Sequence, residues 1–146
     1  MTTFTNNRKA HFNYRVTETF EAGIELLGFE VKSIKKGQAN LTGSFCIIRG
    51  NEAYIINMHI PPYQPKNTPE EYVPDRPRKL LLSKKEIKKL ESADKSKGLT
   101  LIPMSLYSKG RRIKVEIAIA KGKKLFDKRE IIKKRDLDRE LGKKYK

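Results

Sequence analysis

The chain has 146 residues, of which 37% are hydrophobic and 34% are charged; this is the size of one domain with a modest core, and it excludes a chain that is disordered throughout. The 33 basic and 17 acidic side chains leave a formal net charge of +16, which makes nucleic acid the first partner to consider. No stretch approaches the roughly 20 apolar residues of a membrane span, and the N-terminus lacks the apolar run of a signal peptide, so we expect a soluble, cytoplasmic protein without a membrane partner.

The first third of the chain predicts one strand and one ambiguous segment. Residues 1–6 are polar, and we expect them to be frayed. Alternation of apolar and polar residues from Tyr14 toward Phe20 predicts a strand. Residues 26–36 fit either a strand or a short helix that closes at Gly37.

A hairpin and a proline-rich loop follow in the middle of the chain. Residues 44–49 and 53–59 carry the alternation of half-buried strands, and Gly50-Asn51-Glu52 joins them. Gly and Asn tolerate the positive φ of a tight turn, so the pair is typical of a hairpin. Six prolines then fall within residues 61–77, which predicts an extended surface loop rather than a regular element.

The next segment predicts one helix and two further strands. Ser83 and Glu86 match a capping box, so a helix is expected over about residues 84–91. Residues 99–107 predict a strand in which Pro103 requires an edge position or a bulge with a change of phase. After a turn at Ser108-Lys109-Gly110, the regular alternation over residues 113–119 predicts the last strand.

These elements favour a mainly β fold, a small closed antiparallel barrel of OB-like topology with one to three short helices and a basic C-terminal tail. The barrel is expected over residues 7–120. Residues 121–146 hold 12 Lys or Arg and 5 Asp or Glu, a net charge of 12 − 5 = +7. The β pattern ends where this charge begins, so we treat these residues as a separate tail.

The tail carries Leu137, Leu141 and Tyr145 four residues apart, so a helix would place them on one stripe. A short, strongly basic helix is marginal by itself. We therefore predict a tail that is disordered in free solution and becomes helical on an RNA surface. The alternative is a terminal helix packed permanently on the barrel.

Catalytic and metal-binding patterns are poorly supported. His11 and His59 are the two histidines, Cys46 is the one cysteine, and neither GxSxG nor HExxH occurs. Cys46 lies in an apolar run and is expected to be a core side chain that forms no internal disulfide. We expect no enzyme, no metal and no cofactor.

Basic residues beside aromatic ones form three candidate RNA-binding clusters, because Lys and Arg neutralise phosphates and aromatic rings stack on unpaired bases. A shared RNA surface at the strand ends is predicted from these clusters. Composition alone makes Glu21 an ordinary surface residue, although a carboxylate can accept hydrogen bonds from base amino groups or 2′-hydroxyls. The clusters contain Arg8, Lys9 and Tyr14; Arg78 and Lys79; and Lys121, Lys123 and Lys124.

Several blocks follow one another along the chain: Phe20-Glu21-Ala22-Gly23-Ile24, residues 28–33, Arg78-Lys79-Leu80-Leu81-Leu82, residues 97–103, residues 114–118 with 120–124, and Asp127-Lys128-Arg129. In residues and in order they are similar to blocks of the SsrA-binding protein family (small protein B). Together they cover the chain from about Asn7 to Asp136. Phe12 stands where the family usually has a histidine two residues before the tyrosine that matches Tyr14, so no role is carried over to His11.

The resemblance implies an OB-like barrel that binds the transfer-RNA-like domain of transfer-messenger RNA and enters stalled ribosomes with it and, through that RNA, with elongation factor Tu. Barrel and RNA together would imitate a transfer RNA, and the tail would form a helix in the empty messenger-RNA channel near the decoding centre. A monomer is expected. Glu21 and Leu81 match positions at the RNA contact, and Asp127, Lys128 and Arg129 match the tail motif used on the ribosome. Lys133, Lys134 and Arg135 are expected to bind the ribosome as part of the same tail.

Two other classes remain open from the residues. A ribosomal or other general OB-fold protein that binds ribosomal RNA would share the charge and the barrel but would show little preference among structured RNAs. An RNA-processing enzyme would need a metal or an acid–base pair, and turnover of purified RNA would reveal it.

Overall fold

Long strands form where apolar residues occupy every second position. In β7 (Arg112–Gly122), Ile113, Val115 and Ile117 are buried on one face, whereas Lys114 and Glu116 are half-buried on the other. This is the pattern of a sheet that packs one face on the core. The strand ends at Gly122, two residues beyond the predicted boundary, and its last residues pair with the start of β2.

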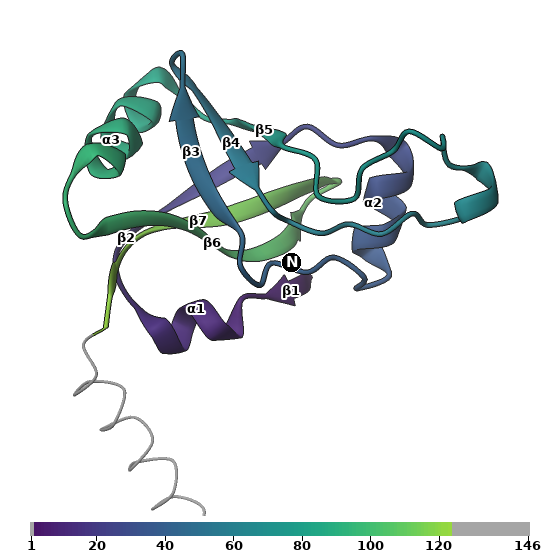
Figure 1. Cartoon of the computed structure of the whole chain (residues 1–146), viewed down its shortest axis with the longest axis horizontal. Coiled ribbons are helices and arrows are strands. Elements are labelled where there is room, and N and C mark those ends of the chain that lie inside the picture. Colours follow the sequence, from purple (N-terminus) through teal and green to yellow (C-terminus); the bar gives the residue numbers. More distant parts are fainter. Residues whose placement is uncertain (1, 124–146) are drawn as a thin grey trace, which may run out of the picture.

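The computed structural model describes residues 2–123, which form seven strands, three α-helices and a short 3₁₀ helix (Figure 1). In chain order the elements are β1 (Thr3–Asn6), α1 (Arg8–Asn13), β2 (Tyr14–Ile24), α2 (Gly28–Lys35), β3 (Phe45–Arg49), β4 (Glu52–Ile56), η1 (Pro65–Asn67), β5 (Arg78–Leu81), α3 (Lys84–Lys95), β6 (Leu99–Lys109) and β7.

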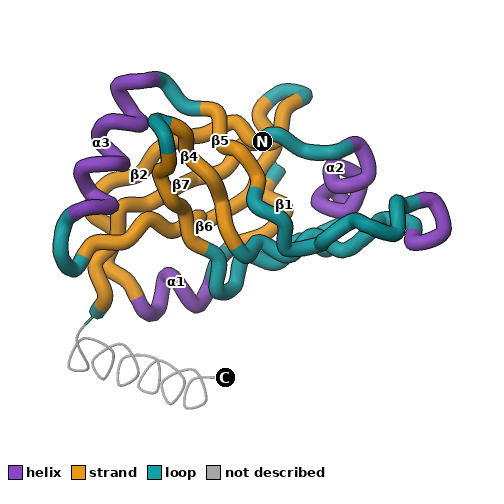
Figure 2. Tube along the Cα trace, turned by 45° about the horizontal axis from the view of Figure 1, so that its top comes forward, coloured by secondary structure: helices purple, strands orange, loops and turns teal. Residues whose placement is uncertain are grey.

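The strands form one antiparallel sheet in the order β1-β6-β7-β2-β5-β4-β3. The sheet curves so that β3, at one end of the order, lies against β6 near the other end, and the helices lie around its margins (Figure 2). The predicted mainly β fold with up to three helices is confirmed. The closed barrel is not confirmed, because β3 contacts β6 without joining it in a hydrogen-bonded ladder.

Two apolar clusters lie on opposite faces of the long strands. The main core fills the concave side and includes Phe20, Leu101 and Ile117. A smaller cluster on the other face packs Ala10 of α1 against Met104 and its neighbours, with Tyr14 at the margin. Helix α1 is therefore fixed at the end of the sheet where β2 begins (Figure 1).

The N-terminus was predicted incorrectly. Residues 3–6 form β1 and pair with β6, and the Thr2 carbonyl accepts a hydrogen bond of 2.7 Å from the Ser108 N–H. Polarity suggested fraying, but an edge of β6 supplies backbone partners that local composition does not reveal. Helix α1 was also missed; its first turn is capped by the Asn7 side chain, which accepts from the Ala10 N–H at 3.2 Å.

The other predicted elements agree with the structure in kind. Of the two alternatives for residues 26–36, the structure has the helix: α2 covers Gly28–Lys35, and Gly37 follows at φ 74°. The capping box at Ser83 and Glu86 is present, and α3 continues to Lys95. At Pro103, β6 shifts register, and β1 pairs with β6 only from Ser105 onward.

The proline-rich segment, residues 61–77, is an irregular loop that contains one turn of 3₁₀ helix, η1. It runs beside α2 (Figure 1). The hairpin prediction also holds, with Gly50 and Asn51 at φ 59° and 64°. Within residues 2–123, no helix has the length and apolar character needed to cross a membrane.

Candidate RNA-binding surface

One row of residues crosses four strands on the outer face of the sheet. Gly23 in β2 lies opposite Leu81 in β5 on one side and Lys114 in β7 on the other, and Lys114 lies opposite Tyr107 in β6. Glu21 is two residues before Gly23, so it projects from the same face about 7 Å along the strand. Residues 86 positions apart in the chain thus meet at one place.

The Glu21 carboxylate is held by two donors from β6. The Tyr107 hydroxyl donates to Oε2 at 2.6 Å, and the Lys109 ammonium donates to Oε1 at 3.1 Å. These two hydrogen bonds hold the pKa of Glu21 below its usual value, and the bond from Tyr107 has the larger effect. Burial and the hydrogen bond to Glu21 raise the pKa of the Tyr107 hydroxyl. Glu21 is therefore an ionised acceptor, and its side chain is 38% exposed.

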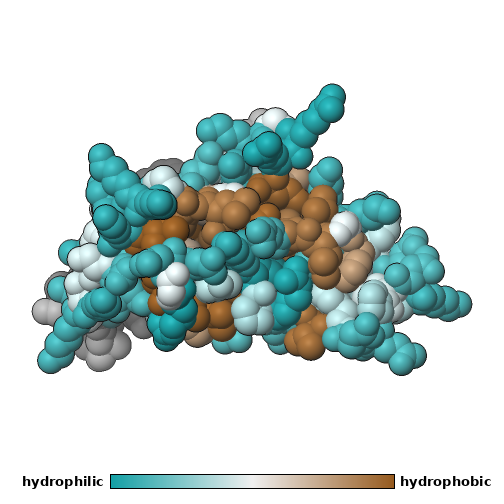
Figure 3. Space-filling view, turned by 90° about the horizontal axis from the view of Figure 1, so that it is seen from above, coloured by the Kyte–Doolittle hydropathy of each residue, from teal (hydrophilic) through white to brown (hydrophobic). Residues whose placement is uncertain are grey.

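An open groove of about 410 Å³ is lined by Gly23, Leu81 and Lys114 of this row. Its apolar part includes Ile24, Leu26 and Leu81, and Leu81 is 50% exposed. On the face seen in Figure 3, apolar residues form a band that hydrophilic residues border. Arg111, Arg112 and Lys114 line the basic side of the groove.

Glycine at position 23 allows the close packing of this row. A Cβ there would lie 3.2 Å from the Cβ of Leu81, tighter than ordinary contact. The missing side chain lets Leu81 pack closely against the backbone of β2 at this point. Arg111 and Arg112 also line the groove and were not among the residues named from the sequence, although their position directly after the predicted turn at Gly110 could have indicated them.

A second group of predicted residues lies at the other end of β2. Arg8 and Lys9 are on α1, Tyr14 begins β2, and the Lys123 ammonium donates to the His11 carbonyl at 3.0 Å. Seven residues of strand, roughly 23 Å, separate Tyr14 from Glu21. Exposed Lys121 also lies at this end, opposite Arg15. The predicted RNA-binding residues therefore fall into two regions rather than one.

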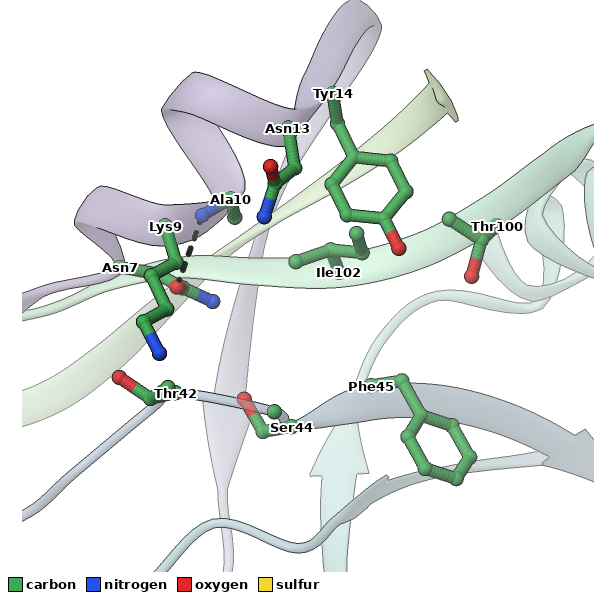
Figure 4. A pocket seen from close by; sticks show the side chains of 11 residues that line it. Asn7, Lys9, Ala10, Asn13, Tyr14, Thr42, Ser44, Phe45, Thr100 and Ile102 are labelled. Carbon is green, nitrogen blue, oxygen red and sulfur yellow. Dashed lines mark hydrogen bonds between the residues drawn. The ribbon is translucent and has the colours of Figure 1, made fainter. Parts of the chain in front are cut away.

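A pocket of about 410 Å³ lies within this second region. Lys9, Asn13 and Tyr14 line one side, Phe45 lies on the opposite side, and Ile102 lies between them (Figure 4). The Phe45 side chain belongs to β3, so the pocket spans the place where β3 faces β6 without pairing. It combines an amine, an amide and two aromatic rings.

Arg78 does not lie on an exposed RNA-binding surface. Its side chain is buried, with Nε 2.7 Å from Oε2 of Glu30 and an Nη donating to the Met58 carbonyl at 2.6 Å. The predicted contact with RNA therefore disagrees with the burial of this residue. Its partner lies 48 residues away and could not be identified from a local basic cluster. Lys79 is partly exposed and forms an ion pair of 3.1 Å with Glu52.

Glu30 accepts hydrogen bonds from groups on three segments. Arg76 and Arg78 contact its carboxylate, and the Leu27 N–H donates to Oε1 at 2.7 Å. The Tyr72 hydroxyl lies 2.9 Å from Oε2 and 2.9 Å from the Ile60 carbonyl. Burial opposes ionisation, but the hydrogen bonds and the charge of Arg78 lower the pKa of Glu30 below its usual value. This network holds the loop of residues 61–77 against α2.

Other predicted features have different outcomes. Cys46 is buried, and burial raises the pKa of its thiol, as expected of a core residue. In the part of the chain that the structure describes, no cluster of three or more His, Cys, Asp or Glu could hold a metal. The following predicted residues lie outside the described residues: Lys124, Asp127, Lys128, Arg129, Lys133, Lys134 and Arg135.

The chain is similar to known proteins in sequence and in fold. A family model described as SmpB protein matches residues 4–146. The chain is 54% identical to the SsrA-binding protein of Elusimicrobium minutum over 96% of this chain and 88% of that protein. It is 53% identical to the SsrA-binding protein of Persephonella marina over 96% and 91%. A solved chain described as "tmRNA-SmpB: a journey to the center of the bacterial ribosome" has a TM-score of 0.71 and 41% identity, covering 88% of this chain and 93% of that one. The chain therefore belongs to the SsrA-binding protein family.

Proposed function

We propose that this protein binds the transfer-RNA-like domain of transfer-messenger RNA and delivers it to stalled ribosomes for trans-translation. Its membership of the SsrA-binding protein family and its likeness to a solved chain described with tmRNA and the bacterial ribosome support this role. The work would take place in the cytoplasm, where the ribosomes are. Elongation factor Tu would take part through its own contact with the RNA.

The observation that carries the proposal is the groove beside Glu21. Leu81 offers an exposed apolar surface, Arg111 and Arg112 offer charge for phosphates, and Glu21 offers an ionised acceptor. An RNA with unpaired, accessible bases satisfies all three, because its bases carry both apolar faces and donor edges. The elbow of a transfer-RNA-like fold exposes such bases, whereas a regular duplex pairs them.

The curved sheet would act as an OB-like binding module over residues 7–120. The end at which β2 begins would face the ribosome. Arg8, Lys9, Tyr14, Lys121 and Lys123 lie at that end, where the described chain continues into the tail. Barrel and RNA would together take the place of a transfer RNA. That the tail becomes helical in the messenger-RNA channel stays a prediction from its sequence.

The test is a titration of the full chain with the isolated transfer-RNA-like domain and with an ordinary elongator transfer RNA, repeated at several salt concentrations. Phosphate contacts alone weaken steeply as salt rises. A preference for the transfer-RNA-like domain that persists at higher salt is the expected result. Equal affinities that collapse together would contradict the proposal and would favour a general RNA-binding protein.

A further inference from the structure

The carboxylate of Glu21 has a fixed position before any RNA arrives. Its Oε2 accepts from the Tyr107 hydroxyl at 2.6 Å, and the Tyr107 side chain is itself buried. A buried tyrosine moves little, so it limits the rotamers that the glutamate can adopt. Lys109 also contacts the carboxylate, but its side chain is 64% exposed and contributes less, because exposed ion pairs are weak.

Two acceptor positions on this carboxylate remain available. An ionised carboxylate has about four lone-pair sites, and Tyr107 and Lys109 occupy one on each oxygen. Each oxygen therefore retains one site, and the side chain is 38% exposed. Two acceptor oxygens on one planar group match a ligand with two adjacent donors, as in the pairing of a carboxylate with arginine.

Among the four RNA bases, guanine has that pattern on its Watson–Crick edge, where the N1–H and the N2 amino group lie side by side. Adenine and cytosine place an acceptor nitrogen beside their single amino group, and the imino donor of uracil lies between two carbonyl oxygens. An acceptor aimed at an ionised carboxylate is repelled. Reading this edge also requires that the base is unpaired.

We propose that Glu21 binds the Watson–Crick edge of one unpaired guanine and that Tyr107 is the positioning residue that aims its carboxylate. This inference rests on the proposed function and names the base that the groove selects. The guanine ring would lie toward Gly23 and Leu81, in the open groove that these two residues line. Arg111, Arg112 or Lys114 would then meet the adjacent phosphates.

The experiment replaces each unpaired guanine of the transfer-RNA-like domain, one at a time, by inosine, which lacks the N2 amino group. Binding of the full chain is measured at one fixed salt concentration for the natural sequence, Glu21→Gln and Tyr107→Phe. A hydrogen bond to a charged group is worth roughly tenfold or more in affinity. One inosine position should therefore weaken binding by the natural chain about tenfold.

The variants decide whether that loss belongs to Glu21. The same inosine should change binding to Glu21→Gln by less than about twofold, because the two-acceptor contact is already absent. Tyr107→Phe should show an intermediate sensitivity. Tyr63→Phe is the control. Tyr63 lies in the loop of residues 61–77, where its ring faces the ammonium group of Lys32 in α2. A chain that lacks the Tyr63 hydroxyl should retain the full tenfold effect of the inosine. Thermal unfolding of each variant excludes a general loss of fold.

Two results would overturn the inference. One is that no inosine substitution weakens binding by the natural chain. The other is that the inosine substitution to which the natural chain is sensitive weakens binding by Glu21→Gln to the same extent. Either can occur while the natural chain still prefers the transfer-RNA-like domain over an elongator transfer RNA, in which case the proposed function stands. Loss of that preference itself is the separate result that contradicts the proposed function.

Discussion

Arg78 and Glu30 form an ion pair inside the protein: Nε of Arg78 lies 2.7 Å from Oε2 of Glu30, and neither side chain is exposed. The pair joins β5 to α2, and Arg76 and Tyr72 extend it into the loop of residues 61–77. A buried charge that loses its partner is strongly unfavourable. The stability of the whole loop therefore depends on this contact.

Replacing Arg78 should be much more destabilising than replacing its neighbour. Arg78→Ala leaves a buried carboxylate with fewer donors and should lower the free energy of unfolding by about 3 to 5 kcal/mol. Lys79→Ala, the matched control, removes a partly exposed ion pair with Glu52 and should cost far less. Urea denaturation of the two variants and the natural chain measures both. Equal losses would contradict a structural role for Arg78.

Stability should fall in acid through Glu30. The pKa of Glu30 is lower in the folded protein than its ordinary value of 4.5, so the unfolded state binds more protons in this range. The contribution of Glu30 to the stability of the folded protein is fully present above its pKa in the unfolded state, and it is lost as the pH falls through its pKa in the folded state. Urea denaturation between pH 6 and about pH 3 should show this loss.

Two variants separate Glu30 from the other carboxylates in that titration. Glu30→Gln should have lower stability at pH 6 and a flatter fall toward acid than the natural chain. Glu70→Gln, the matched control, removes an exposed carboxylate of the proline-rich loop and should leave the stability at pH 6 nearly unchanged. A natural slope in Glu30→Gln would show that other groups cause the acid dependence.

Arg111 and Arg112 should contribute phosphate contacts to RNA binding. Each substitution by alanine should reduce the slope of log affinity against log salt by roughly 0.7 to 0.9 for the transfer-RNA-like domain. The matched control is Lys95→Ala on α3, a residue that is 75% exposed and bonded to Glu91. An unchanged slope in both arginine variants would place the RNA elsewhere on the surface.

The tail should act on the ribosome rather than on the isolated RNA. Changing Asp127, Lys128 and Arg129 together to alanine removes one net positive charge, so affinity for the transfer-RNA-like domain should stay within about threefold. Tagging by stalled ribosomes in a reconstituted translation system should be blocked. If both activities fall together, the division between groove and tail is wrong.

Local patterns were enough to predict most elements and part of the binding surface. Alternation located β3, β4, β6 and β7, the capping box located α3, and the turn at Gly50 and Asn51 was recognised from residue type. Each is a property of neighbouring residues. The failures at residues 3–6 and at Arg78 both involve partners far away in the chain, namely β6 and Glu30.

The sequence by itself determined the mainly β class, the basic charge and the family, because these follow from composition, from short-range periodicity and from ordered blocks of residues. Only the tertiary structure decided how the predicted binding residues are divided. It buried Arg78, brought Tyr107 and Lys109 to Glu21, and set Glu21 and Tyr14 at opposite ends of β2. The reason is physical: a basic side chain is equally suited to a phosphate and to a buried carboxylate, and the register of the strands selects which one it meets.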